Sequence, residues 1–94
     1  MDTINIVKIT FDTTKSVANI KTRGLSFDRV ADLDWSTADI VEDTRRDYGE
    51  RRYRVIGYLD GRLHVAVFTP RGEAVHVISL RKANVREVKR YAET

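Results

Sequence analysis

Arginine and histidine residues lie inside the strand-like segments of the second half of the chain, where a purely structural sheet has little use for them. Arg54 and Arg81 lie within or at the end of apolar runs, and His64 and His76 are each flanked by apolar residues. Guanidinium groups bind phosphate oxygens through two parallel donors and stay charged at any working pH. This pattern predicts a polyanion as the ligand.

The charge of the 94-residue chain is divided unevenly along its length. Residues 1–44 carry five Lys or Arg against eight Asp or Glu, whereas residues 45–94 carry twelve against six. The second half is therefore +6 and the first half −3, which together give the net charge of +3. Such a split favours a basic face for nucleic acid, although a well-solvated small domain can segregate its charges without binding anything.

The start of the chain predicts a strand followed by a helix. The β-branched residues between positions 4 and 11 form the expected opening strand. Asp12 is suited to cap a helix that runs to about Arg23, and Gly24 is suited to end it. This is the first of two helices expected in the N-terminal half.

The next segment carries weaker signals. Ser26 is a candidate cap for a short second helix over residues 27–31. The segment 35–42 is ambiguous, with Ile40 and Val41 as its best strand residues, and 43–49 is expected to be a charged loop.

Two turn signals divide the second half into strands. Asp60-Gly61 between two alternating runs is typical of a two-residue hairpin turn. Residues 70–72, Pro-Arg-Gly, suit a three-residue hairpin loop. Together these turns predict that Ile56 pairs with Val65 and that Val65 pairs with Val77.

This register makes both faces of the sheet largely apolar, so both must be covered. A last helix is expected after Asn84, whose side chain forms a capping box with Glu87. The chain is too short for two cores, which makes residues 1–94 a single domain. The predicted fold is α+β, an antiparallel sheet with two N-terminal helices and a C-terminal helix.

Several motifs along the chain resemble the BrnT toxin family. They are Phe11-Asp12, Lys15, Asn19, Arg23-Gly24-Leu25-Ser26-Phe27, Ala31, Gly49-Glu50-Arg51-Arg52-Tyr53, Ile56-Gly57, Ile78-Ser79-Leu80-Arg81-Lys82-Ala83-Asn84 and Glu87. Their order and spacing cover nearly the whole chain, and the segment 78–84 with Glu87 is the most specific part. The chain departs from the family pattern at Arg23, usually His, at Phe11, often Trp, and at His76, commonly Arg.

The resemblance implies a RelE-like ribonuclease fold and the toxin of a type II toxin–antitoxin pair. It implies a ribbon-helix-helix antitoxin of the BrnA type as partner, in a heterotetramer of two toxins and two antitoxins. DNA would then be contacted only through the antitoxin. The expected activity is endoribonucleolytic cleavage of cellular RNA, which inhibits translation and growth.

Metal-free RNA cleavage needs a base for the 2′-hydroxyl, an acid for the leaving 5′-oxygen and positive charge at the phosphate. Arg81 and Arg54 are the candidates for phosphate stabilisation, Glu50 for the base and His76 for the acid. Arg81 ranks first because it carries the stronger family match. In the register above, Arg54 and Arg81 lie towards opposite ends of the sheet, so both cannot contact one phosphate unless the register slips or a curved sheet brings them together.

Each of these residues also has a structural interpretation. Arg81 can pair with Glu87, and Glu50 can neutralise the neighbouring arginines. A histidine between apolar strand residues is more often packed and hydrogen-bonded than catalytic, and this applies to both His64 and His76, which the register places on one face. For RNA binding, the candidates are Lys15, Arg51, Arg52 and Lys82.

Other chemistries find no support in the sequence. The absence of cysteine removes disulfides, thiol catalysis and thiolate metal sites. No histidine spacing resembles a metal site and no Gly-rich phosphate loop is present, so neither a metal nor a cofactor is expected. The N-terminus lacks a signal peptide and no long apolar run occurs, which favours a cytoplasmic protein without membrane contact.

Two other functions compete with the ribonuclease. The first is a non-catalytic binding module that keeps the toxin fold and acts as a co-repressor with a DNA-binding partner. The second is a structural DNA-binding domain, which ranks last because the sequence has no helix-turn-helix or other groove-reading element.

Overall fold

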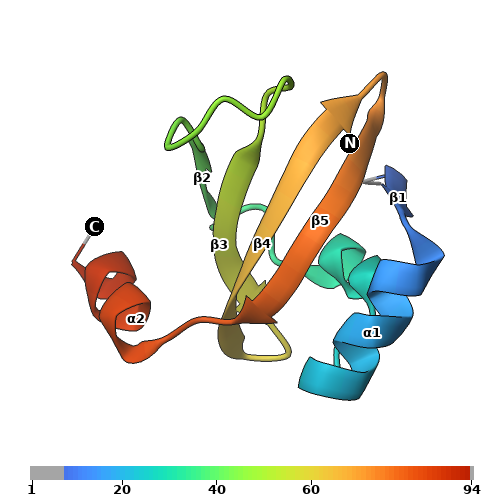
Figure 1. The fold of residues 1–94 in the computed structure, drawn as a ribbon. Coiled ribbons are helices and arrows are strands. Elements are labelled where there is room, and N and C mark those ends of the chain that lie inside the picture. Colours follow the sequence, from blue (N-terminus) through green and yellow to red (C-terminus); the bar gives the residue numbers. More distant parts are fainter. Residues whose placement is uncertain (1–7, 94) are drawn as a thin grey trace, which may run out of the picture.

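A computed structural model describes residues 8–93 of the chain. Its centre is a five-stranded sheet in the order β1-β5-β4-β3-β2 (Figure 1). The strands are β1 (Lys8–Phe11), β2 (Asp39–Glu42), β3 (Tyr53–Leu59), β4 (Arg62–Arg71) and β5 (Ala74–Lys82). The predicted α+β class is confirmed, but the purely antiparallel sheet is wrong, because β1 pairs with β5 in parallel.

The helices of the N-terminal half begin and end close to the predicted residues. In α1 (Thr13–Arg23), the Asp12 carboxylate accepts a hydrogen bond from the Lys15 N–H at 3.1 Å, and Gly24 ends the helix in a left-handed conformation. The second helix, η1 (Phe27–Asp32), is a 3₁₀ helix that begins after Ser26, but the Ser26 side chain forms no capping hydrogen bond. Residues 4–7 of the expected opening strand lie outside the described part of the chain.

The β3–β4 hairpin has the predicted turn and register. Asp60 and Gly61 both adopt positive φ, at 53° and 78°, as a two-residue hairpin turn of this type requires. Ile56 pairs with Val65, as expected.

The β4–β5 hairpin differs from its prediction. Arg71 pairs with Ala74, so the turn is Gly72-Glu73 and Pro70 remains in the strand. Proline is tolerated there because the pairing with β3 stops opposite Phe68, which leaves this end of β4 at an edge of the sheet.

A β-bulge shifts the pairing of β4 with β5 further. Val65 pairs with Arg81 instead of Val77, Val67 pairs with Ser79, and Phe68 pairs with Val77. Ile78 therefore has no partner and is the extra residue in β5. Strand side chains alternate between the two faces with a period of two. The extra residue therefore puts the β5 side chains before Ile78 on the opposite faces from those they would have in a regular ladder continued from residues 79–82.

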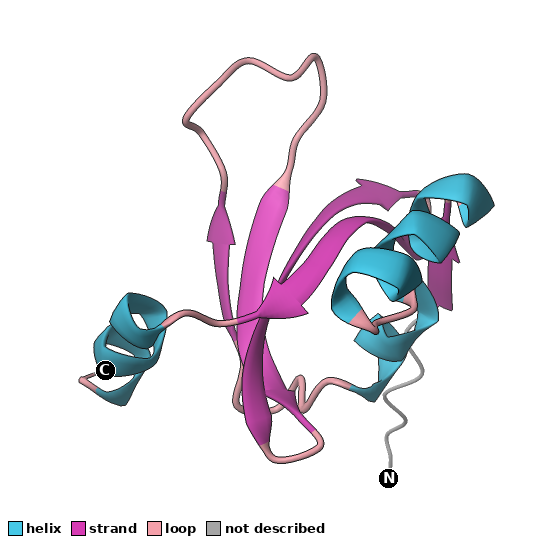
Figure 2. Ribbon diagram, turned by 60° about the horizontal axis from the view of Figure 1, so that its bottom comes forward, coloured by secondary structure: helices cyan, strands magenta, loops and turns pink. Residues whose placement is uncertain are grey.

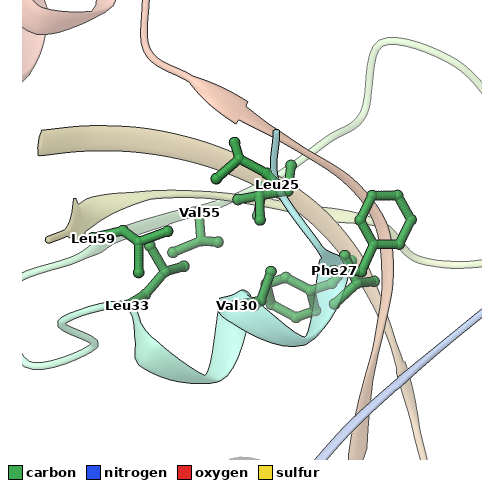
Figure 3. Close-up of a cluster of buried hydrophobic side chains, with 10 residues drawn as sticks. Leu25, Phe27, Val30, Leu33, Val55 and Leu59 are labelled. Carbon is green, nitrogen blue, oxygen red and sulfur yellow. The ribbon is translucent and has the colours of Figure 1, made fainter. Parts of the chain in front are cut away.

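The bulge turns Val75 and Val77 towards the side of the sheet that α1 and η1 cover. We call this side the core face and the opposite side the outer face. On the core face, buried side chains from η1, the loops beside it and β3 pack together (Figure 3). The buried cluster consists of Leu25, Phe27, Val30, Leu33, Val55, Leu59, Ala66, Phe68, Val77 and Leu80.

The C-terminal helix α2 (Val85–Ala92) lies on the other side of the sheet from α1 and η1, next to β2 and β3 (Figure 2). The predicted capping box between Asn84 and Glu87 is present. No residue of α2 is buried. The Tyr91 hydroxyl donates to the Thr37 carbonyl oxygen at 2.5 Å, and the Tyr91 ring packs edge-on against Tyr58.

No described helix has the length and apolar composition needed to span a bilayer.

Asn19 ties α1 to the core, because its side-chain amide donates to the carbonyl oxygens of Leu25 and Leu80 at 2.9 and 3.0 Å. We expect Asn19→Ala to lower the free energy of unfolding by about 2 kcal/mol, since it removes two hydrogen bonds and leaves carbonyls without a partner. Urea titration followed by circular dichroism measures this. Thr22→Ala, which removes an exposed bond to the Ala18 carbonyl, should change stability by less than about 0.5 kcal/mol. Equal effects of the two substitutions would contradict the role of Asn19.

Candidate functional site

Arg54 and Arg81 lie on the same face of the sheet, the outer face. Arg54 pairs with Val67, which pairs in turn with Ser79, and Arg81 follows two residues later on the same side of β5. Their Cα atoms are two strands and two residues apart, about 12 Å from the strand geometry. Two extended arginine side chains can span this separation. The expectation that they lie towards opposite ends of the sheet is wrong, because it rested on the Val65–Val77 register.

The Arg81 guanidinium forms a two-pronged ion pair with Glu87 at the start of α2. Its two terminal nitrogens donate to the two carboxylate oxygens at 2.7 and 2.8 Å. Glu87 also accepts the backbone N–H of Asn84 at 2.9 Å. The hydrogen bonds from Arg81 lower the pKa of Glu87 from 4.5 to about 2, although partial burial opposes this, and the charge of Arg54 contributes in the same direction. The same hydrogen bonds raise the pKa of Arg81.

Of the two arginines, Arg54 is the one whose guanidinium is not engaged by a carboxylate of the described chain. Its guanidinium forms no hydrogen bond or ion pair with any residue in the range 8–93, although its charge attracts Glu87. It lines a pocket of about 220 Å³ between the outer face and α2. The lining residues are Asp39, Val41, Arg54, Ile56, Glu87, Arg90 and Tyr91.

A third arginine from the 43–52 loop adds positive charge near this pocket. The Arg45 side chain donates to both carboxylate oxygens of Asp43 at 2.8 Å, and Tyr48 donates to the same carboxylate. These bonds lower the pKa of Asp43 well below its usual range, with Arg45 as the main cause. The charge of Arg45 also opposes the rise in the pKa of Arg81, so the two guanidinium groups repel each other.

The proposed base, Glu50, lies away from this pocket. Its carboxylate oxygens lie 3.5 Å from Arg52 Nε and 3.8 Å from Arg71 Nη2. The Arg52 guanidinium stacks over the Tyr48 ring at 4.2 Å. Glu50 therefore lies beside one neighbouring arginine, Arg52, as its structural interpretation expected, and beside Arg71 at the end of β4, which it did not.

The two histidines lie on opposite faces, which contradicts their predicted placement on one face. His64 is buried on the core face, where its Nδ1–H donates to the Arg62 carbonyl oxygen at 2.8 Å. His76 lies on the outer face, where its Nδ1 is hydrogen-bonded to the Thr10 hydroxyl at 2.9 Å. The bulge at Ile78 causes the difference. His76 is five residues before Arg81, about 16 Å along β5.

The predicted RNA-binding residues do not form one surface. Lys15 is exposed on α1, and Lys82 lines a hollow with Arg23 and Leu25 on the α1 side of the sheet. Arg51 lies near Tyr53 and Glu42, which raise its pKa, with the hydrogen bond to Tyr53 as the main cause. Of the four candidates, Arg52 alone lies beside residues of the outer face, through Glu50 and Arg71.

Sequence reasoning missed Asp39 and Arg71 as members of the outer face. Asp39 pairs with Ile56 at the edge of the sheet, and Arg71 precedes the β4–β5 turn. Local sequence shows no sign of either role, because Asp39 reads as the polar start of a short strand and Arg71 as part of a loop. Only the observed structure places Asp39 diagonal to Arg54 of β3 and Arg71 beside Glu50.

The chain matches a known family over most of its length. Residues 11–87 match the family model described as the ribonuclease toxin BrnT of type II toxin–antitoxin systems. The chain belongs to the BrnT family. A search of curated proteins finds no match.

Membership in the BrnT family indicates a ribonuclease toxin of a type II toxin–antitoxin system, which implies an antitoxin protein as partner. The matched region contains Arg54, Arg81 and Glu87, whereas Arg90 and Tyr91 follow it. The departure from the BrnT pattern at Arg23 lies beside Lys82 at the end of α1, away from the pocket that Arg54 lines.

The Arg81–Glu87 pair predicts how stability depends on pH. Because the folded-state pKa of Glu87 is lowered to about 2, the pair stabilises the fold above the ordinary pKa of 4.5 and loses this effect as the pH falls towards 2. The full shift corresponds to about 3 kcal/mol, which solvent screening at the one-third exposed Arg81 reduces to about 1–2 kcal/mol.

Glu87→Gln keeps the capping geometry and removes the charge. Urea titrations between pH 5 and pH 2 should therefore show a shallower loss of stability in Glu87→Gln than in the wild type. Glu73→Gln, at the exposed β4–β5 turn, is the matched control and should follow the wild-type curve. A Glu87→Gln curve parallel to the wild type would show that Glu87 does not titrate in this window.

Proposed function

We propose that this BrnT protein is an endoribonuclease that binds the scissile phosphate between Arg54 and Arg81 and cleaves RNA without a metal ion. The observation that carries the proposal is an arginine without a salt-bridge partner in the described chain, Arg54, beside the Arg81–Glu87 pair on one face of the sheet. Guanidinium groups stabilise the negative charge that develops on phosphate oxygens in the transition state. Within residues 8–93, no three His, Asp or Glu side chains gather as metal ligands.

The reaction that fits these groups is attack by the neighbouring 2′-hydroxyl. Its oxygen forms a bond to phosphorus, its proton passes to a base, and the bond from phosphorus to the 5′-oxygen breaks. The leaving oxygen takes a proton from the solvent, and the products carry a 2′,3′-cyclic phosphate and a 5′-hydroxyl. Arg54 and Arg81 neutralise the two phosphoryl oxygens that gain charge.

Glu87 is the carboxylate best placed to accept the 2′-hydroxyl proton. In the free protein it is a weak base, because hydrogen bonds from Arg81 lower its pKa to about 2. A phosphate that takes over the Arg81 donors removes the main cause of this shift, and the pKa of Glu87 then returns towards its ordinary value. Binding of the substrate thus prepares the base.

Glu50 and His76, the groups that the sequence suggested for proton transfer, lie towards the other end of the outer face. Arg52 and Arg71 lie beside Glu50 there. An RNA strand that continues along the outer face passes these arginines, so we assign this end to the flanking nucleotides. His76 is hydrogen-bonded to Thr10 and contributes to the shape of this surface.

The partner that we propose is a BrnA-like ribbon-helix-helix antitoxin, in an assembly of two toxins and two antitoxins that contacts DNA only through the antitoxin. Val85 and Val88 on α2 are 73% and 46% exposed. Apolar side chains exposed in this way support coverage by a partner protein. In its absence the toxin would cleave RNA in the cytoplasm and inhibit translation and growth.

Removal of either arginine tests the phosphate site. We expect Arg54→Ala and Arg81→Ala each to reduce the cleavage rate of purified cellular RNA by about 100-fold or more, the usual cost of losing one transition-state donor. Arg62→Ala, at the exposed β3–β4 turn, is the matched control and should cleave like the wild type. EDTA should leave all rates unchanged. Circular dichroism confirms folding of each variant.

Two outcomes would count against the proposal. Full activity of a folded Arg54→Ala protein would remove the phosphate site from the pocket. No cleavage by a folded wild type, with or without added divalent ions, would favour the non-catalytic binding module instead.

A further inference from the structure

The pocket between α2 and the outer face has the composition of a nucleobase site. Its apolar walls come from Val41 and Ile56 on the sheet and from the Tyr91 ring on α2. Its volume of about 220 Å³ is below the range of about 300–1,000 Å³ that holds drug-sized ligands. A single flat ring system fits such a space, and single-stranded RNA is commonly recognised by bases splayed into pockets with aromatic walls.

Three charged side chains in this pocket form no hydrogen bond or ion pair with any residue between 8 and 93. Asp39, Arg54 and Arg90 all line it, and none of the three side chains forms a hydrogen bond or ion pair with another residue of the described chain. In contrast, the carboxylates of Glu87 and Glu50 on the same side of the sheet form ion pairs, with Arg81 and Arg52 respectively. A pocket with apolar walls and a few convergent unpaired polar groups is the usual form of a ligand site.

Asp39 is held at a defined place in this pocket by the backbone. It pairs with Ile56 in the β2–β3 ladder, diagonal to Arg54, which pairs with Val41. The chain before it can approach β3 closely because residue 57 is glycine, where an added Cβ would lie 3.1 Å from the Ala38 Cβ. The Asp34 N–H also donates to the Tyr58 carbonyl oxygen at 2.8 Å. The carboxylate is therefore exposed but fixed to a rigid strand.

We propose that this pocket binds a guanine base, with Asp39 as the acceptor and Arg90 as the donor that read it. Guanine presents adjacent N–H donors on its Watson–Crick edge, which suit a carboxylate, and the O6 and N7 acceptors, which suit an arginine fork. Adenine lacks the two adjacent N–H donors on its Watson–Crick edge. A pyrimidine does not combine such donors with the O6 and N7 acceptors. Tyr91 supplies a ring wall, which the hydrogen bond to the Thr37 carbonyl and the contact with Tyr58 keep in place.

This inference rests on the proposed ribonuclease function and adds a base preference to it. Glu87 lines the same pocket and is the proposed acceptor of the 2′-hydroxyl proton. The base in the pocket is therefore that of the nucleotide whose 2′-hydroxyl attacks. Arg54 remains with the phosphate, between the base and Arg81.

The test is binding of the four nucleoside 3′-monophosphates to the full chain, measured by titration and by backbone NMR shifts. We expect guanosine 3′-monophosphate to bind about tenfold more tightly than the adenosine, cytidine and uridine forms, with shifts at Asp39, Arg90 and Tyr91. Asp39→Asn should remove most of this preference, since one good bidentate base contact has about this effect. The control Asp28→Asn, on η1 and exposed, should keep it. Cleavage of RNA oligonucleotides that contain a single guanine gives the matching kinetic readout.

The outcomes separate this inference from the ribonuclease proposal. Cleavage without base preference, equal binding of the four nucleotides, or a guanine preference that survives Asp39→Asn would overturn the guanine pocket while leaving the nuclease in place. Selective binding of guanosine 3′-monophosphate by a protein that cleaves no RNA would support the pocket and overturn the nuclease. Shifts at Asp39 and Arg90 caused only by an added antitoxin would make the pocket a protein contact and overturn the inference.

Discussion

One extra residue in β5, Ile78, sets the register on which the outer face depends. On its N-terminal side, Val75 and Val77 turn towards the helices, where Val77 joins the buried cluster and β1 pairs alongside. On its C-terminal side, Ser79 and Arg81 turn the other way. A regular ladder would put the two valines in solvent at the expense of several kcal/mol of apolar burial, about 2 kcal/mol for each side chain. Core burial therefore fixes the bulge, and with this register Arg81 lies on the same face as Arg54, two strands away.

The position of α2 depends on few interactions. No residue of the helix itself is buried. The Arg81–Glu87 ion pair, the Tyr91 hydrogen bond to Thr37 and the ring contact with Tyr58 join it to the sheet. Segments held by few buried contacts lie at the low end of local stability in a domain. The pocket thus has one rigid wall, the sheet, and one wall that can yield to a ligand.

Local signals in the sequence were sufficient for most elements but not for the register of the last hairpin. Asp12, Gly24, Asp60-Gly61 and the Asn84–Glu87 box each act within a few residues, and the structure has α1, the first hairpin and α2 as predicted. The Pro70-Arg71-Gly72 segment fits a loop on local grounds, yet its pairing is decided by burial of Val75 and Val77. That choice is non-local. Arg54 was proposed from its residue type and Arg81 from its type and the resemblance, whereas their proximity and the proposed role of Asp39 required the observed register.

The ion pair that helps to hold α2 at the site is also the one that a phosphate would displace in the proposed mechanism. Glu87 and a phosphate present similar oxygens to the same guanidinium fork, so they compete for Arg81. In the proposed mechanism Arg54 favours this exchange, because its guanidinium forms no hydrogen bond or ion pair with residues 8–93 that a phosphate would have to break. The carboxylate that loses Arg81 remains within the field of Arg54 and keeps its bond from the Asn84 N–H. In the proposed mechanism it therefore stays ionised and becomes a better proton acceptor, so substrate binding and activation of the base would follow from the same exchange of partners.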